Sequence, residues 1–489
     1  MLEGEIILLW PILLPLVAGA ILPFIKSFQN RRICNWFVGS IVVITFGFVL
    51  TAAFGTQKTL IIWNLTKDIP IYLKLDAVGK LFYVLTALMW IPVSFYSFEY
   101  MKHEEREVRY YSFFLLTLAV LLGISSAGNL ITMYLFYEGM SLSTLGLIIH
   151  NQSKEAVAAG HKHIFYSIGG ALLGLFGFFF VYNYGTTLEF LPGGVLDPIK
   201  ISGQEPLLLI VFFFMIIGFG SKAGMFPLHG WLSAAHPVAP APASAVLSGN
   251  ITKMGVLAII RIVYYIAGVS FLRETWVQYA LITFTLITVF MGSMLAYKER
   301  ELKKRLAYST VSQVSYVLFG ISLMNPIGLL GALLHVVYHS IVKNTLFLTA
   351  GTFIYQTGKR MVIQLKGIGK QMPITLWCFT LVSITLVGIP PTSGFVSKWY
   401  LASGAIEQRI PYIWWFGPVI LLISALLTAG YLLSITVKGF FPEKEEEKLK
   451  ESSLMTIPIL CLTVVAILLG MFPNYLIDYI NRAITIIFC

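Results

Sequence analysis

Charged residues are scarce in this chain: aspartate, glutamate, lysine and arginine make up only 12% of its 489 residues. Ordinary soluble domains carry about 25% charged residues. Hydrophobic residues account for 57%, and the mean hydropathy is +0.81. The scarcity of charge therefore excludes an ordinary soluble domain and indicates an all-α polytopic membrane protein.

Cysteine is also rare, and its four copies are scattered at Cys34, Cys378, Cys461 and Cys489. Their spacing matches no zinc or iron–sulfur ligand pattern. No Gly-Lys-Ser/Thr phosphate-binding loop and no GxGxxG nucleotide fingerprint is present in the sequence. We expect neither a metal nor a cofactor in this chain, so its energy source is an ion gradient or a partner protein.

Apolar runs of about 20 residues predict some fourteen helical membrane spans. The expected spans are 6–25, 36–54, 78–98, 110–127, 129–149, 163–183, 207–235, 243–267, 275–296, 306–323, 327–354, 373–402, 412–437 and 453–472. Glu3 and Glu5 precede the first run where a signal peptide would carry basic residues, so we expect a retained first span. The residues after 474 read as a short amphipathic end.

Basic residues divide the loops into two alternating sets, and this distribution explains the net charge of +11 without a nucleic-acid partner. The rich set holds Lys26, Arg31 and Arg32; Lys102, Arg106 and Arg109; Lys154 and Lys162; and the loops at 298–305, 359–370 and 438–450. The other set is sparse, with Lys58, Lys67, Lys74, Lys200, Arg273 and Arg409. The positive-inside rule places the rich set in the cytoplasm and both termini on the outer side.

One span contains a lysine next to helix-breaking residues. In the run 207–235, Lys222 is followed by Gly224 and Pro227. A lysine inside a membrane helix costs roughly 2.5–3.5 kcal/mol. Interrupted helices are tolerated at membrane depth mainly where they line a polar cavity or are buried in protein. We therefore expect Lys222 to lie in a hydrated path and to carry protons.

A second break, Gly388 to Gly394, leads directly to Lys398 and suggests an internal duplication. Each break lies in the fourth span of a five-span unit, 110–267 or 275–437. Because each unit has an odd number of spans, the two are inverted relative to each other. We predict four regions, with 1–109 before these repeats and 438–489 after them.

Glu138 is the clearest acid within the predicted spans, and Lys222 is its natural partner because membrane acids usually pair. Two interpretations remain open. The pair is either a fixed ion pair that holds two helices together or a pair that opens and closes to change the protonation of Lys222.

Further titratable residues follow inside later spans. Lys253 is either part of the path or a snorkelling lysine, and Arg261 is expected at the membrane interface. His335, His339 and Lys343 recur every four residues and share a helix face, which suits a stepped proton relay. A His-His metal site is the alternative, although the sequence shows no third ligand. Lys398 is either the counterpart of Lys222 or an interfacial anchor.

Five motifs together resemble one known family. They are Phe136-Tyr137-Glu138 and the stretches 222–232, 242–249, 304–313 and 388–395. With them the chain resembles the antiporter-like subunits of the complex I superfamily. That group includes the large, D-type subunits of Mrp-type Na+/H+ antiporters and the corresponding subunits of membrane-bound hydrogenases and NADH:quinone oxidoreductases. The sequence around His236 is more similar to the hydrogenase-type members.

The resemblance implies fourteen helices, two inverted repeats and a row of charged residues at mid-membrane. It places Glu138 and Lys222 at the coupling pair, Lys253 at the bridging lysine and Lys398 at the end of the path. His335 and His339 fall on the histidine helix. The implied location is the cytoplasmic membrane of a prokaryote.

The function expected from the sequence is proton translocation, with Na+ exchange left open, by one subunit of a multisubunit membrane complex. Other membrane subunits are its partners, and any redox chemistry belongs to them. A hydrogenase-type or Mrp-type complex is favoured over an NADH:quinone oxidoreductase. The rival interpretations are a stand-alone transporter of a small solute and a passive scaffold with fixed ion pairs.

Overall fold

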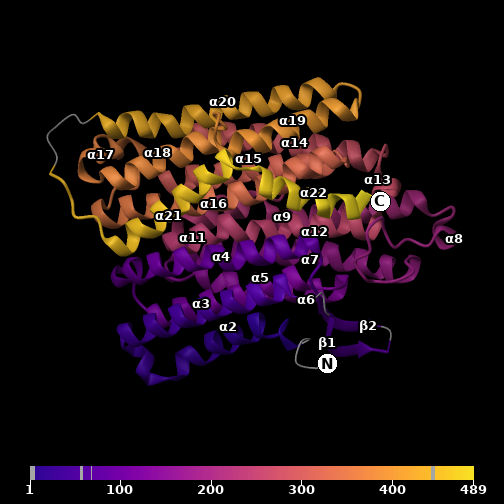
Figure 1. The fold of residues 1–489 in the computed structure, drawn as a ribbon, viewed down its shortest axis with the longest axis horizontal. Coiled ribbons are helices and arrows are strands. Elements are labelled where there is room, and N and C mark those ends of the chain that lie inside the picture. Colours follow the sequence, from indigo (N-terminus) through magenta and orange to yellow (C-terminus); the bar gives the residue numbers. More distant parts are fainter. Residues whose placement is uncertain (1–5, 56–58, 68, 442–446, 489) are drawn as a thin grey trace.

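The computed structural model describes residues 6–55, 59–67, 69–441 and 447–488. Glu3, Glu5, Lys58 and Cys489, which enter the sequence predictions, lie outside these ranges. The structure is mostly helical, and most helices run roughly side by side along its longest dimension (Figure 1).

The α-helices are α2 (Trp10–Ile21), α3 (Arg31–Phe54), α4 (Ala77–Tyr100), α5 (Glu107–Ser126), α6 (Leu130–Ile148), α7 (Lys154–Tyr184), α8 (Pro198–Ile201), α9 (Glu205–Ala223), α10 (Gly230–Val238), α11 (Ala241–Val246), α12 (Thr252–Ile260), α13 (Val269–Leu272), α14 (Trp276–Lys298), α15 (Leu302–Ser322), α16 (Pro326–Thr357), α17 (Ile368–Gln371), α18 (Pro373–Val387), α19 (Ser393–Gln408), α20 (Ile413–Phe440), α21 (Ser453–Met471) and α22 (Asn474–Phe488). The short 3-10 helices are η1 (Leu22–Phe24), η2 (Lys26–Gln29), η3 (Met101–His103) and η6 (Val362–Leu365). Two π-helical turns, η4 (Leu247–Ile251) and η5 (Arg261–Ala267), and two strands, β1 (Thr59–Thr66) and β2 (Ile69–Lys74), complete the fold.

Within the described residues, ten helical stretches are long and apolar enough to cross a membrane. Two shorter apolar helices, Trp10–Phe24 and Pro373–Val387, accompany them. The prediction of a helical, multi-pass membrane protein is therefore confirmed.

Two predicted spans are each divided into a pair of helices, at the positions that the glycines and prolines indicate. α9 ends at Gly224 and α18 ends at Gly388, and both glycines have positive φ values, 76° and 90°. A left-handed residue is a common helix terminator, and glycine adopts it without a steric cost. The chain resumes as α10 after the first break and as α19 after the second.

The stretch 241–267, which contains the predicted span 243–267, changes its helical winding twice. The π-helical η4 separates α11 from α12, and η5 continues from α12. Every residue of this stretch is buried. Such π-helical turns occur frequently at functional sites. The apolar pattern did not reveal them because they alter hydrogen bonding and not hydropathy.

A β-hairpin interrupts the otherwise helical chain, so the prediction of an all-helical fold needs correction. β1 and β2 pair antiparallel, from Thr59 opposite Lys74 to Thr66 opposite Ile69. Asn129 donates a hydrogen bond from Nδ2 to the Pro70 carbonyl at 2.7 Å, which attaches β2 to the start of α6. The hairpin lies at one end of the bundle (Figure 1).

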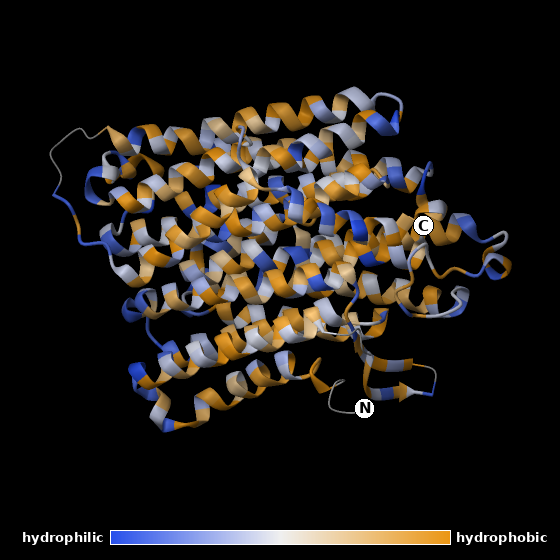
Figure 2. Cartoon of the chain, viewed as in Figure 1, coloured by the Kyte–Doolittle hydropathy of each residue, from blue (hydrophilic) through white to orange (hydrophobic). Residues whose placement is uncertain are grey.

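α16 lies at the centre of the bundle. It packs against α4, α11, α15, α18, α19, α21 and α22, and all of its residues from 328 to 353 are buried. Hydrophilic residues are found at both ends of the bundle and also within its middle (Figure 2). Polar groups buried inside a membrane protein are costly, so this middle layer is where a functional site is expected.

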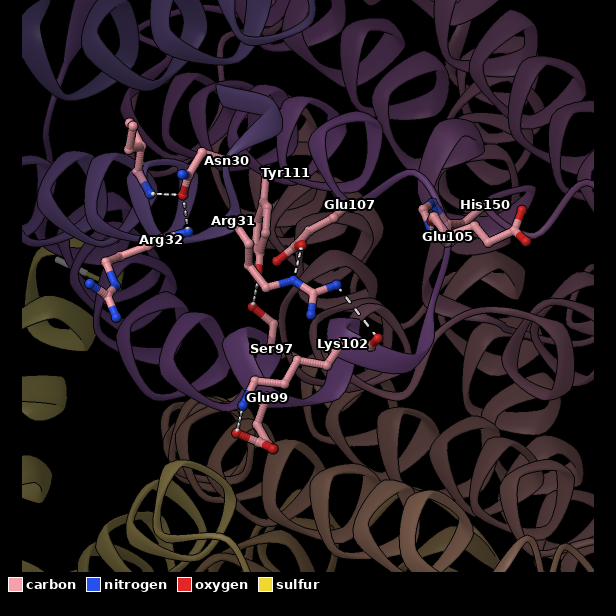
Figure 3. A network of polar contacts seen from close by, with 11 residues as sticks. Asn30, Arg31, Arg32, Ser97, Glu99, Lys102, Glu105, Glu107, Tyr111 and His150 are labelled. Carbon is pink, nitrogen blue, oxygen red and sulfur yellow. Dashed lines mark hydrogen bonds and ion pairs between the residues drawn. The ribbon is translucent and has the colours of Figure 1, made fainter. Parts of the chain in front are cut away.

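At the end of the bundle opposite the hairpin, ion pairs connect the first helices. Arg31 of α3 pairs with Glu107 of α5 at 2.7 Å and also donates to the Lys102 carbonyl after α4, at 3.5 Å, so it joins the ends of the three helices (Figure 3). Lys102 pairs with Glu99 at 2.8 Å within the end of α4. Exposed ion pairs of this kind contribute about 0–1 kcal/mol each, so we assign them a modest role in holding the helix ends together.

Arg261, whose position near a span end suggested an interfacial residue, is buried inside the protein next to the start of α4. It is 2% exposed, and its guanidinium donates two hydrogen bonds to Asp76, at 2.5 and 2.6 Å. The rings of Phe190 and Tyr265 lie 4.8 and 4.6 Å from the guanidinium carbon. Asp76 precedes α4, so this bidentate pair connects the first helices to the end of the first predicted repeat.

Candidate functional site

Lys222 lies in the last turn of α9, immediately before the first break. It is fully buried, and its ammonium has no hydrogen-bond partner among the described residues. Across the break, the ring of Trp231 lies 5.8 Å from the Lys222 ammonium. The Trp231 indole N–H donates to the Ser221 carbonyl at 2.8 Å, which also accepts the Gly224 N–H at 3.1 Å, so this hydrogen bond holds the two sides of the break together.

Glu138 faces the same region from α6 but does not touch Lys222. The two charges interact electrostatically, yet they are not among the ion pairs of the described chain. Glu138 is partly buried, and it accepts a hydrogen bond from the Tyr134 hydroxyl at 3.2 Å. Glu138 and Lys222, which the sequence suggested as a pair, therefore interact electrostatically but do not form a direct ion pair.

His163 is a member of this group that the sequence analysis missed. It is buried on α7, its Nε2 lies 3.0 Å from the Thr144 hydroxyl, and its ring lies 4.7 Å from that of Trp231. Lys222 lies within electrostatic range of His163. The sequence showed only a histidine at the start of the predicted span 163–183. A single histidine does not indicate a functional site unless its neighbours in space are known.

Lys253 follows the π-helical η4 and is also buried. Its ammonium donates to the Ser248 carbonyl at 2.5 Å and contacts the Thr252 hydroxyl at 3.4 Å. The Ser248 hydroxyl lies 2.6 Å from that of Thr310, which links this group to α15. Lys253 therefore does not snorkel to the membrane surface, and its ammonium stays inside the protein.

Gly255 determines how closely α12 approaches α9. A Cβ atom at this position would lie 2.7 Å from the Ala223 nitrogen and 3.0 Å from the Lys222 Cβ. Only glycine permits this contact without movement of one helix. The close approach brings the helices of Lys222 and Lys253 together.

His335, His339 and Lys343 lie in a buried row on α16, as their spacing predicted. The two imidazole rings are stacked with centroids 5.7 Å apart. His335 Nδ1 lies 2.9 Å from the Ser397 hydroxyl, and Lys343 donates to the Ser309 hydroxyl at 2.7 Å. His339 has no hydrogen-bond partner among the described residues at either ring nitrogen.

His339 lies within electrostatic range of both Lys253 and Lys343, so it connects the lysine of the first predicted repeat to α16. The alternative of a metal site receives no support from the side chains. Among the described residues, no three histidine, cysteine, aspartate or glutamate side chains form a group that could hold a metal ion.

Lys398 lies just after the second break and differs from Lys222 in its surroundings. Its ammonium donates to the carbonyls of Leu386 and Val387, at 2.7 and 2.9 Å, and lies 5.0 Å from the centre of the Tyr316 ring. A cation at the C-terminal end of a helix interacts favourably with its free carbonyls. Lys398 is only partly buried, which suits the end of a path.

The seven predicted residues form a row on α6, α9, α12, α16 and α19. Electrostatic interactions link Glu138 to Lys222, Lys253 and Lys343 to His339, and His335 to Lys398. Several buried polar atoms in this layer have no hydrogen-bond partner in the described chain, including Lys222 Nζ, His335 Nε2, both ring nitrogens of His339 and both amide atoms of Gln313. Buried polar atoms in proteins are nearly always hydrogen-bonded to protein or to water. The layer therefore combines buried lysine and histidine side chains with polar atoms that the described chain leaves unpaired.

The fold and this row define a class: an integral membrane protein that holds lysines and histidines inside its helical bundle. The chain belongs to the family described as NADH:quinone oxidoreductase/Mrp antiporter, TM, whose model matches residues 127–428. The earlier resemblance to this group is confirmed.

Individual relatives agree with this membership. The chain is 31% identical over 425 residues to the N subunit of the NADH-quinone oxidoreductase of Desulforudis audaxviator, covering 83% of each chain. It is 28% identical over 480 residues to the D subunit of the Na+/H+ antiporter of Bacillus subtilis, covering 97% of this chain and 95% of that protein. In structure, it matches a chain of the Mrp complex from Dietzia sp. DQ12-45-1b with a TM-score of 0.86 and 22% identity, over 99% and 97% of the two chains.

Proposed function

We propose that this chain is a proton-translocating subunit of a multisubunit membrane complex and that protons move along the buried row. The observation that carries the proposal is the fully buried Lys222 ammonium without a hydrogen-bond partner in the described chain, with Glu138 nearby but not in contact. A structural ion pair would join the two groups directly. An acid held apart from a buried cation instead has room to approach and retreat.

In the proposed cycle, approach of Glu138 stabilises the protonated form of Lys222, and its retreat favours release of the proton, because a neighbouring opposite charge favours the ionised amine. The proton then passes by Lys253 and His339. From there His335, hydrogen-bonded to Ser397, hands it toward Lys398 at the second break. Lys343 is proposed to set the charge next to His339.

The proposed topology has fourteen membrane crossings in the cytoplasmic membrane of a prokaryote, with both termini outside. The regions are 1–109, an inverted pair of five-helix repeats at 110–267 and 275–437, and 438–489. Two features support it: each repeat contains one broken helix beside a lysine, and the loops rich in basic residues join the same ends of successive helices.

Exchange of Na+ for H+ is the second candidate, favoured by the name of the Bacillus subtilis relative. Partners in the proposed complex are other membrane subunits. Copurification separates the options, since hydrogenase-like, NADH-oxidising and purely antiporter partners define different complexes.

The test uses the intact complex reconstituted in liposomes, with a pH-sensitive dye for H+ and isotope uptake for Na+. Lys222→Ala and Glu138→Gln are expected to reduce H+ transport at least tenfold while the complex still assembles. Lys200→Ala, in exposed α8, is the matched control and should transport normally. Normal transport by both test variants with lower stability would favour the scaffold interpretation, and transport of a solute by the isolated chain would favour a stand-alone transporter.

A further inference from the structure

An apolar groove lies between α4 and α21. Its volume is about 410 Å³, and its lining includes Leu88, Met89 and Phe95 of α4 with Ile457, Cys461 and Val465 of α21. Ser453, at one end of the groove, has a hydroxyl group, and none of the described residues that line the groove is charged. The groove therefore suits a ligand that is apolar over nearly its whole length.

Short side chains on the two helices create this groove. Pro92 lies inside α4, and Pro458 lies inside α21 one turn before Cys461. These three side chains are too short to fill the space between the helices, whereas Met89 and Leu462, which are 1% and 3% exposed, close it on the protein side. Lining atoms without a neighbour forfeit dispersion contacts, so the groove favours an occupant.

The groove opens to the hydrocarbon of the membrane. Both α4 and α21 are long and apolar enough to cross a bilayer, and α21 carries no charged residue from Ser453 to Met471. Its outward side chains include Leu460, Val464 and Leu468, which are 40%, 50% and 47% exposed. A helix side of this composition faces lipid, so acyl chains and not water compete for the groove.

The dimensions of the groove separate an acyl chain from a protein helix as its occupant. On α21 the lining runs from Ser453 to Val465, about 18 Å at 1.5 Å per residue, so the mean cross-section is about 23 Å². A helix about 10 Å across has a cross-section of about 80 Å². A helix can lie over the groove but cannot enter it, whereas a chain of single methylene groups can. The length is close to half of a hydrocarbon core about 30 Å thick, which is the depth of one leaflet.

Basic residues lie just outside the Ser453 end of the groove. Lys448 and Lys450 are exposed and form no ion pair with the described residues. The neighbouring Glu451 is instead hydrogen-bonded to Thr375 at the start of α18. The two ammonium groups are therefore available to a phosphate at the end of α21, where the polar head groups of the bilayer begin.

We propose that the groove between α4 and α21 binds one phospholipid, with an acyl chain along Met89, Cys461 and Val465 and the phosphate beside Lys450. A chain in this groove is contacted by two helices, whereas a chain against the outward side of α20 is contacted by one helix. The bound phospholipid should therefore exchange with the bilayer more slowly than other lipids. This site does not depend on the proposed proton route and is tested by binding alone.

The experiment uses the intact complex in vesicles that contain phosphatidylcholine with a photoreactive diazirine on one acyl chain. The complex is then transferred into an excess of unlabelled lipid, so that freely exchanging lipids are lost before illumination. Mass spectrometry should find severalfold more adducts on the residues of the groove than at Leu422 and Leu426, which are 63% and 66% exposed on α20. Equal labelling of the two sides, which means bulk lipid only, would overturn the proposal, and so would a groove without lipid adducts because a partner helix covers it.

A pair of tryptophan variants tests the groove itself. Cys461→Trp fills the groove and should lower its labelling severalfold. Leu460→Trp is the matched control, because Leu460 is exposed on the same helix but does not line the groove. Equal labelling of the groove in the two variants would overturn the proposal.

A charge reversal tests the phosphate contact without changing the apolar packing. In the double variant Lys448→Glu and Lys450→Glu, the amount of phospholipid that stays bound to the detergent-purified complex, measured by native mass spectrometry, should fall severalfold. Lys200→Glu, in exposed α8, is the control and should retain its phospholipid. Unchanged retention by the double variant would show that no phosphate is held at this end and would overturn the proposal.

Discussion

The Arg261 guanidinium and the Asp76 carboxylate form a bidentate ion pair between residues 185 positions apart in the chain. Burial opposes ionisation of Asp76. The charge and hydrogen bonds of Arg261, with the Gly79 N–H, nevertheless hold the pKa of the Asp76 carboxyl below its usual value. The pair therefore stabilises the folded chain at neutral pH.

Asp76→Asn is expected to lower the free energy of unfolding by about 3–5 kcal/mol, because it leaves the buried Arg261 without its counter-charge. Denaturant titration of the detergent-solubilised protein measures the change. Asp197→Asn is the control: Asp197 caps the short helix α8, and asparagine caps helices equally well. Equal stability of the two variants would contradict the prediction.

The ion pair between Arg261 and Asp76 also makes the stability of the folded chain depend on pH at low pH. Since the folded-state pKa of Asp76 lies below the unfolded value, the contribution is fully present above about pH 4 and is lost as the pH falls further. In Asp76→Asn this part of the pH dependence is absent. Stability curves of the two proteins between pH 3 and 7 should therefore converge at low pH.

His150, which follows α6, predicts a pH dependence at higher pH. Burial and, to a lesser degree, Arg109 and Arg106 lower its pKa to about 4, against the effect of its hydrogen bond to the Glu105 carbonyl. The folded state therefore binds fewer protons than the unfolded state. Stability should be full above about pH 6.5 and should decline toward pH 4. In His150→Gln the melting temperature should fall less across this window; an unchanged slope would show that His150 does not contribute.

Replacing the two lysines beside the breaks is expected to affect stability differently. Lys398 satisfies two carbonyls at the end of α18, so Lys398→Met should lower the free energy of unfolding by about 1–3 kcal/mol. Lys222 has no hydrogen-bond partner in the described chain, so Lys222→Met should leave stability unchanged or raise it. Thermal unfolding of both variants measures the two changes in stability. A larger loss in Lys222→Met than in Lys398→Met would contradict the contacts described for the two lysines.

Gly255→Ala tests the spacing between α9 and α12 without removing a titratable group. The added methyl group would force the helices apart at Lys222, and overpacking of this kind costs about 1–3 kcal/mol. Proton transport by the complex should fall severalfold. Gly169→Ala is the matched control, because a Cβ at Gly169 of α7 meets nothing within 4 Å. Equal transport by the two variants would show that the close approach is not required.

Part of this fold and site could be predicted because the signals are local. Gly224 and Gly388 mark the two breaks by backbone chemistry alone, and the four-residue spacing of His335 and His339 places them on one helix face. What the sequence could not show depends on distant contacts. The ion pair of Arg261 could not be predicted because its partner Asp76 lies far away in the chain. His163 belongs to the site only through its contact with Trp231.

α16 has one more consequence. It runs unbroken through 32 residues, about 48 Å at 1.5 Å per residue, and it carries His335, His339 and Lys343 on this single rod. A continuous helix packed on many sides resists bending, whereas the helix pairs α9–α10 and α18–α19 are each interrupted at a glycine and can bend there. Motion during turnover should therefore occur in the interrupted helices, and the approach and retreat between Glu138 and Lys222 would come from movement of α9 while α16 stays in place.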